Sequence, residues 1–312
     1  MKTGFPLNRR AFRTSLSLQL RRNNFGARPN VRPRRYCRLT AGLFAVLATL
    51  GYGAAALAYI VHFLARRREH ETAGALSLLV YAALAFHTAW IVAAHLDLGY
   101  LPIATASQSL SLVAWGIALA YVIIEFEGEH RGFGAFIMPV AFVLQAAATA
   151  FLLTRPQPEA LKPILQSVWF ELHVGTALFS YCAFAIAFAA GLMHILLNHE
   201  LRLKRLRFFF TRMPPLHVLE RINRQAIALG FLFLTIGIGS GVIWLLTTPG
   251  LPLSDPKPVS TLIVWLLYAA NIHLRWRMGW RGQRSAIFSV VNFMFLLAIF
   301  FVTSFVLGAH QF

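Results

Sequence analysis

The side chains best suited to chemistry in this sequence are histidines that lie inside or beside long apolar segments. His173 stands near the start of the stretch FELHVGTALFSYCAFAIAF, residues 170–188, which belongs to a run long enough to cross a bilayer. Helical spacing places Ala177 and Ser180 on the same face as His173, and such small neighbours leave room beside the imidazole. A lone helical histidine can bind a proton or a metal, or can simply form a packing hydrogen bond. His173 therefore needs a second feature before it predicts a site.

A second histidine supplies that feature. His310, in the C-terminal sequence TSFVLGAHQF, directly follows the last apolar run. His173 opens the fifth run and His310 closes the eighth, so a chain that crosses with every run brings both to one membrane face. Two imidazoles from different helices could occupy both axial positions of a haem iron. Taken alone, His310 is an ordinary surface residue near a chain end.

Three further histidines have open alternatives. His87 and His95 share a helix face but are eight residues apart, roughly 12 Å, which is too far for one metal ion. His87 lies within its run near Trp90, whereas His95 lies at the boundary and is expected to be solvated. His273, in NIHLRWRMGWRGQR, either contributes to a second intramembrane site or bonds to a neighbouring helix.

The elements that must position these residues are transmembrane helices. Of the 312 residues 58% are hydrophobic and only 13% are charged, well below the quarter expected of a soluble domain. The apolar runs lack the alternation of barrel strands, and lipid leaves helices as the only other spanning structure. The sequence predicts an all-α, polytopic transmembrane bundle of about eight spans. These are Ala41–Ala65, Thr72–His95, Thr105–Phe126, Ala135–Thr154, Trp169–Leu197, Ile222–Thr247, Val259–Trp276 and Ser285–Leu307.

No catalytic motif accompanies the histidines. The chain has no G-x-S-x-G, no phosphate loop and no zinc motif, and Cys37 and Cys182 form no C-x-x-C pair. Acidic residues inside the spans are confined to Glu125 and Glu171, both near helix ends, which disfavours a proton-coupled solute carrier. We therefore assign no catalytic residue and expect no independent catalytic activity.

The basic residues predict an orientation. The formal net charge is +18, and eleven of the 29 Lys and Arg lie before residue 39, in a tail without acids. Odd-numbered loops carry fourteen of the remainder and even-numbered loops only three, which predicts both termini on the external side. The charge thus follows membrane topology and the lipid surface, and nucleic-acid binding is not expected. We expect residues 1–40 to be a spurious or processed extension, or else the topology to be inverted, with residues 41–312 forming the transmembrane domain.

Five segments in order resemble a known family. They are LPIATASQSLSLVAW, LHVGTALFSYCAF, SDPKPVSTLIVW, NIHLRWRMGWRGQRSA and VLGAHQF. Together they resemble the cytochrome c assembly family, which includes CcsA/ResC synthase subunits and their HemX-like and YpjD relatives. The resemblance extends from about Leu101 to the end of the chain.

The resemblance implies roles for individual residues. His173 and His310 match the family's two external haem-ligand histidines, and His273 matches a transmembrane histidine. Asp255 matches the aspartate of an Asp-Pro-Lys in the external haem loop. The sequence departs from the pattern there, because TTPGLPLSDPKPVS has no tryptophan, and Gln108 stands where a glutamate is expected. The loop is closer to the HemX-like and YpjD side of the family.

The function that follows is haem handling in c-type cytochrome biogenesis, in the bacterial plasma membrane. We expect haem b as cofactor, bound by His173 and His310 as iron ligands, with His273, His87 and Asp255 as further haem-binding candidates. The implied partners are haem, a CcsB-like subunit, apocytochrome c and the lipid bilayer. The alternative is a HemX-like membrane regulator or scaffold of haem biosynthesis that does not attach haem.

Overall fold

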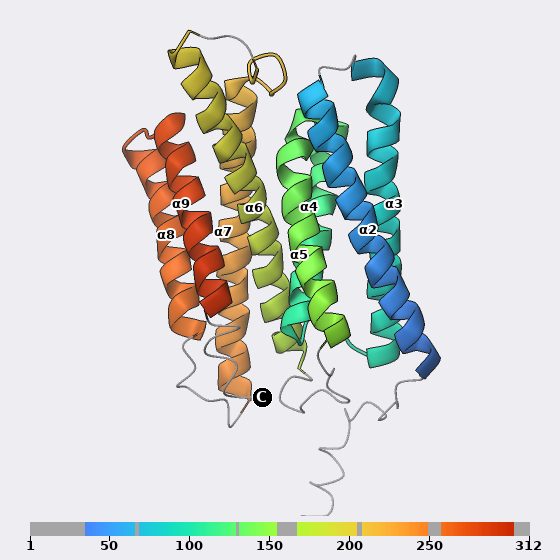
Figure 1. Cartoon of the computed structure of the whole chain (residues 1–312). Helices are drawn as coiled ribbons and strands as arrows, with labels where there is room; N and C mark the ends of the chain where they lie inside the picture. Colours follow the sequence, from blue (N-terminus) through green and yellow to red (C-terminus); the bar gives the residue numbers. More distant parts are fainter. Residues whose placement is uncertain are drawn as a thin grey trace, which may run out of the picture. The chain divides into compact units, whose positions relative to one another are not determined.

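The computed structural model describes residues 35–65, 69–128, 131–154, 167–204, 208–248 and 257–302. Within these ranges the regular structure is entirely helical, as predicted: eight α-helices correspond one for one to the eight apolar runs (Figure 1). The helices are α2 (Arg35–Ala65), α3 (Glu69–Leu98), α4 (Ala106–Gly128), α5 (Gly134–Thr154), α6 (Val168–Arg202), α7 (Leu216–Thr247), α8 (Lys257–Arg277) and α9 (Gln283–Phe301), with a short 3₁₀ turn, η1 (Arg131–Phe133), before α5.

Seven of the described helices are long and apolar enough to cross a membrane, and α8 is the exception. Polar and basic side chains lower the hydropathy of α8, among them Asn271, His273 and Arg275. Its length of 21 residues nevertheless suits a spanning helix. The fold class is therefore confirmed as a polytopic helical bundle.

The helices form two neighbouring groups, α2–α5 and α6–α9, with α6 packed against α4 between them (Figure 1). Of the spanning segments α6 is the most enclosed, with 72% of its apolar window buried against 28–56% for the other six. Its run of buried alanines lets neighbouring backbones approach closely. Where α6 meets α4, Gly116 leaves the space that Cys182 occupies. The buried Cys182 thiol donates a weak hydrogen bond to the Val113 carbonyl at 3.5 Å, so Cys182 acts as a packing residue between the two helices.

The C-terminal ends of α2, α4, α6 and α8 lie at one end of the bundle, here called the basic end (Figure 1). The Arg212 carbonyl lies against Gly132, and the Arg212 guanidinium donates to the Leu64 carbonyl at 3.4 Å. Asn198 donates to the Gln283 side chain at 2.8 Å, which joins the end of α6 to the start of α9. At this end the α6–α7 loop thus contacts α2 and the turn before α5, and the end of α6 contacts the start of α9.

A single carboxylate shapes the described part of the α6–α7 loop. Glu200 accepts hydrogen bonds from the backbone N–H groups of Phe208, Phe209 and Phe210 at 2.6, 2.8 and 2.7 Å. The loop thereby turns Phe208 and Phe209 toward Phe63 of α2, with ring centroids 5.5 and 6.5 Å away. The α6–α7 loop thus ties the second helix group to the first.

The start of α4 explains one departure from the family pattern. Thr105 is its N-cap, and Gln108 reaches back so that its Oε1 accepts from the Thr105 N–H at 3.2 Å and the Ala104 N–H at 3.0 Å. In return the Gln108 N–H donates to Thr105 Oγ1 at 3.3 Å. This reciprocal pattern is a capping box, which accepts glutamine or glutamate at the third helical position. Gln108 therefore has a local structural role that either residue could fill.

Candidate functional site at the outer end of α6

His173 lies near the end of the bundle opposite the basic end, because α6 starts there. Ser167 is the N-cap of α6, and its hydroxyl accepts from the Trp169 N–H at 3.3 Å. The helix therefore begins at Val168, and His173 falls in its second turn with a half-buried side chain. The neighbouring helix at this level is α7, which packs along α6.

The His173 imidazole has a fixed orientation. Its Nδ1 lies 2.7 Å from the carbonyl oxygen of Gly237 on α7. A carbonyl only accepts hydrogen bonds, so Nδ1 carries a proton, and in the neutral form of the ring Nε2 is the unprotonated nitrogen. No described residue bonds to Nε2. A metal-ligating histidine is usually held this way, with the other ring nitrogen donating to a carbonyl or carboxylate.

Two glycines of α7 make the space for this ring. Gly237 and Gly241 are four residues apart and so lie on one helix face. A Cβ added at Gly241 would lie 2.6 Å from His173 Nδ1, and one at Gly237 would lie 3.1 Å from Thr176 Oγ1. Sequence analysis missed both residues. The signal was present in the GIGSG stretch, since small residues four apart in an apolar helix mark close helix contacts.

Aromatic side chains flank the imidazole. Trp244, on the same face of α7 as Gly241, stacks near His173 with ring centroids 6.3 Å apart and an interplanar angle of 26°. Phe170 lies one turn before His173, and its ring centroid is 5.2 Å from that of Trp244. The pair gives the site an apolar wall that comes from helices and not from the α7–α8 loop, where the family's tryptophans would be.

The chemistry of this arrangement suits haem better than a bare metal ion. Among the described residues no three His, Cys, Asp or Glu side chains come together as a metal site. A haem iron already has four porphyrin ligands and needs only axial ones, so a single open imidazole nitrogen beside aromatic surface is sufficient on one side. Among the described residues, His173 is the one that could serve as such a ligand.

The other predicted site residues do not join His173 within the described structure. His310 and Asp255 lie outside the described residues. His273 lies on α8 with an exposed side chain and forms no hydrogen bond with another described residue. The structure therefore gives no support to the alternative in which His273 bonds to a neighbouring helix.

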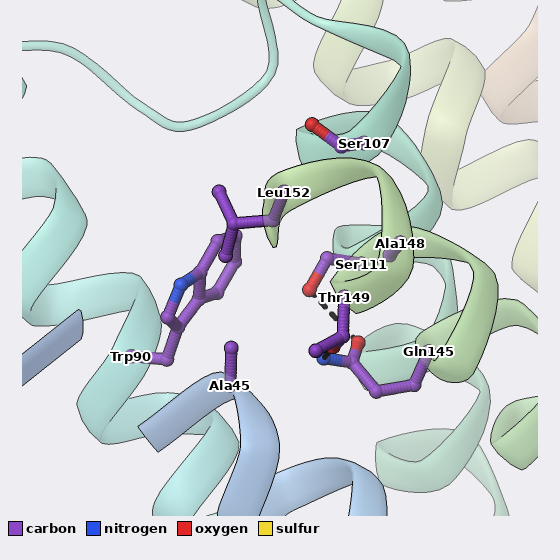
Figure 2. A pocket seen from close by; sticks show the side chains of 8 residues that line it. All are labelled: Ala45, Trp90, Ser107, Ser111, Gln145, Ala148, Thr149 and Leu152. Atoms are coloured by element: carbon purple, nitrogen blue, oxygen red, sulfur yellow. Dashed lines mark hydrogen bonds between the residues drawn. The ribbon is translucent and has the colours of Figure 1, made fainter. Parts of the chain in front are cut away.

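His87 has a different environment. It is fully buried in the α2–α5 group, where Tyr52 Oη lies 3.1 Å from its Nδ1 and Ser111 Oγ lies 2.9 Å from its Nε2. Ser111 also donates to Gln145 Oε1 at 2.8 Å, and Gln145 donates to Thr149 at 3.2 Å (Figure 2). Because both ring nitrogens have partners, His87 would have to leave this network to bind iron.

A small pocket lies beside the His87 network. Figure 2 shows Trp90, Leu152 and Ala45 facing the side chains of Ser111, Gln145 and Thr149 across it. Its interior is too small to admit a water molecule. We find no space for a ligand here, and we interpret the network as packing that fixes the four helices.

Known proteins resemble the part of the chain that contains His173. The family described as Cytochrome C assembly protein matches residues 103–310. The chain belongs to this family. Relatives named Cytochrome c biogenesis protein CcsA include one from Parasynechococcus marenigrum (strain WH8102), which is 30% identical over 291 residues, 85% of this chain and 95% of the relative.

Two further CcsA relatives agree. The protein from Synechococcus sp. (strain RCC307) is 29% identical over 288 residues, 84% of this chain and 92% of its own length. That from Guillardia theta is 29% identical over 224 residues, 66% of this chain and 73% of its own length. The predicted family is thus confirmed, and the chain is a multi-pass membrane protein of cytochrome c biogenesis.

Proposed function

We propose that this protein binds haem b at the end of the bundle opposite the basic end and presents it there for cytochrome c assembly. The observation that carries the proposal is the hydrogen bond from His173 Nδ1 to the Gly237 carbonyl. In the neutral ring this bond leaves the lone pair of Nε2 oriented and free to coordinate iron. His310 is proposed as the second axial ligand. Bound haem would supply an iron for these imidazoles and vinyl groups for the cysteines of an apocytochrome.

The chain's own residues would act by positioning. The Gly237 carbonyl fixes the orientation of the imidazole, and the bare Cα of Gly241 gives the ring its place. Trp244 and Phe170 keep water from one side of the ring and offer apolar surface to a porphyrin edge. Asp255 is proposed to lie close to the bound haem, in the loop that follows α7.

The location and partners belong to the same proposal. The gathering of basic loops at one end supports an orientation with that end inside and the His173 end outside, in the bacterial plasma membrane. Apocytochrome c would then be met at the external face. The exposed His273 side chain favours contact with a second membrane subunit of the CcsB type at a separate intramembrane haem site.

The test is the haem spectrum of the purified full-length protein. We expect a Soret band in the wild type that is lost in the double variant His173→Ala with His310→Ala. His95→Ala is the matched control, because His95 is an exposed histidine at the end of α3, at the same end of the bundle. A Soret band that is unchanged in the double variant would rule out the axial pair.

A second candidate function is a regulatory scaffold for enzymes of haem biosynthesis. It is favoured by the shape of the α6–α7 loop, where Glu200 holds the backbone and leaves Phe210 and Leu203 half exposed among basic residues. Neutralising Arg205 and Arg207 to glutamine should then change cellular porphyrin levels without changing the haem spectrum. Normal porphyrin together with lost c-type cytochromes would count against the scaffold.

A further inference from the structure

A cluster of polar side chains is enclosed between α6, α7, α8 and α9 toward the basic end. Arg275 of α8 points into the bundle, where its Nη2 donates to Asn223 Oδ1 at 2.9 Å and its Nε donates to Ser285 Oγ at 3.0 Å. Asn223 in turn donates to Ser289 at 2.8 Å and to the Ala187 carbonyl at 2.7 Å. Trp276, the next residue along α8, is by contrast 81% exposed.

Two nitrogens of this cluster have no hydrogen-bond partner in the described structure. They are Nη1 of Arg275 and Nδ1 of His194, both buried. His194 itself is 5% exposed, and its ring faces Gly282, where an added Cβ would lie 3.7 Å from Cε1. Buried polar nitrogens normally have partners. The Arg275 Nη1–H group needs an acceptor, whereas His194 Nδ1 donates or accepts according to the ring tautomer.

Gly282 is the N-cap of α9, and no side chain caps that helix. The first N–H groups of α9 are therefore open, and the helix dipole places partial positive charge beside the unpartnered nitrogens. Such a terminus favours an anion with several oxygen acceptors, of which a phosphate is the common example.

A pocket of about 560 Å³ opens directly at this helix start. Its lining combines Arg202, Arg281 and Arg284 with the apolar side chains of Met278, Trp280 and Ile287, and it contains no carboxylate. None of the three arginines forms an ion pair with another described residue. Arg275 and His194 lie beside this pocket and are not part of its lining. Glu220 interacts electrostatically with both of them, and one glutamate does not balance the three arginines of the lining together with Arg275.

We propose that this pocket binds the phosphate of an anionic phospholipid. Guanidinium groups hold phosphate oxygens through paired hydrogen bonds. The mixed lining of arginine with Met278, Trp280 and Ile287 suits a headgroup that continues into an acyl chain. The pocket lies at the basic end of a membrane bundle, which is where basic pockets between helices bind such headgroups. This site is separate from His173 and does not depend on the haem proposal.

Native mass spectrometry of the full-length protein in detergent tests the proposal. The probes are palmitoyl-oleoyl phosphatidylglycerol, the matching phosphatidylcholine and inorganic phosphate. We expect phosphatidylglycerol to stay bound where phosphatidylcholine does not. The variant Arg281→Gln with Arg284→Gln should bind phosphatidylglycerol about thirtyfold more weakly, since each basic residue near an anionic lipid contributes roughly 1 kcal/mol.

The control is Arg221→Gln with Arg277→Gln, which removes the same charge from exposed positions outside the pocket lining. It should bind phosphatidylglycerol within about twofold of the wild type, because the local contacts are unchanged. Equal binding of both lipids, or equal loss in both double variants, would overturn the proposal. Displacement of the lipid by excess inorganic phosphate would overturn the lipid assignment and leave a free-anion site. Circular dichroism melting of each variant shows that the bundle is still folded.

Discussion

At the scale of single residues, His173 gains its meaning from atoms on another helix. The carbonyl of Gly237 selects the tautomer, Gly241 provides the space, and Trp244 covers one side of the ring. Gly237 and Gly241 need not touch a ligand in order to affect its binding. Their effect on binding therefore makes a sharper test of the site than removal of the histidine alone.

Gly241→Ala should displace the imidazole. The new Cβ would lie 2.6 Å from Nδ1, so the ring must move and the bond to the Gly237 carbonyl is lost or lengthened. Because removing such an outer-sphere partner usually costs 10–100-fold in metal affinity, we expect a haem affinity about tenfold to a hundredfold lower in a Soret titration.

Gly239→Ala is the matched control, because the same Cβ there meets nothing within 4 Å. Both substitutions stabilise the helix by the same amount, roughly 1 kcal/mol in helix propensity. A difference in haem affinity between the two variants therefore reflects the added Cβ beside His173. Equal haem affinities for the two variants would contradict the positioning role of Gly241.

Among single residues, the sequence identified His173 but not the residues around it. His173 could be selected because histidine is rare inside an apolar run, and its type alone suggests ligation. Gly237, Gly241 and His194 could not be connected to a site in the same way. Their roles depend on which helix lies opposite, and neither spacing nor composition specifies that neighbour.

At the scale of elements, the sequence contains a clear local signal for the start of α4. The Thr105–Gln108 capping box follows from residues three apart and needs no tertiary information. Gln108→Ala should lower the free energy of unfolding by about 1 kcal/mol, because the backbone N–H groups of Ala104 and Thr105 lose their acceptor.

Gln108→Glu should keep the wild-type stability, since glutamate offers the same oxygen to the same two N–H groups. Thermal unfolding in detergent, monitored by circular dichroism, measures both variants. A loss of stability in Gln108→Glu as large as in Gln108→Ala would contradict the capping role.

The α6–α7 loop makes a second prediction at this scale. In Glu200→Ala the N–H groups of Phe208, Phe209 and Phe210 lose a charged acceptor. Hydrogen bonds to charged groups are worth about 1.5–3 kcal/mol, so amide exchange in this segment should accelerate at least about tenfold. Hydrogen–deuterium exchange with peptide-level detection checks it.

Glu127→Ala serves as the control, because Glu127 is an exposed carboxylate at the same end of the bundle. Its exchange pattern at residues 208–210 should match the wild type. Similar acceleration in both variants would mean that overall charge, and not the Glu200 carboxylate, holds the loop.

The apolar pattern did not predict where two of the helices begin or end. The predicted run from Ile222 corresponds to a helix that starts six residues earlier, at Leu216, and the run to Leu197 to a helix that continues to Arg202. These extensions contain charged and polar residues, among them His199, Glu220 and Arg221, so hydropathy does not detect them. The extension of α6 is held by the hydrogen bond from Asn198 to Gln283.

At the scale of the whole molecule, the number of helices and their alternation could be predicted, because length and hydropathy decide both. The division into α2–α5 and α6–α9, with α6 against α4, could not be predicted, since the hydropathy of one run does not specify which other run it contacts. The contact of Gly116 with Cys182 is one of many pairs that the sequence would have allowed.

Cysteines placed at the two ends of the bundle should differ in their accessibility to a membrane-impermeant reagent. With Cys37 and Cys182 replaced by serine and alanine, a cysteine at Leu101 should react with an impermeant maleimide in intact cells. One at Phe210 should react only after permeabilisation. Both side chains are exposed, 42% and 50%, but lie at opposite ends. The reverse labelling pattern would show that the membrane orientation is inverted.

The hydrogen bond between His173 and the Gly237 carbonyl has an electrochemical consequence. Donation from Nδ1 makes an imidazole a stronger electron donor at Nε2, and a stronger donor stabilises ferric over ferrous iron. An iron ligated here would therefore have a lower midpoint potential than one on an unbonded histidine. Since Gly241→Ala disturbs this bond, redox titration should place its remaining bound haem at a more positive potential than the wild type.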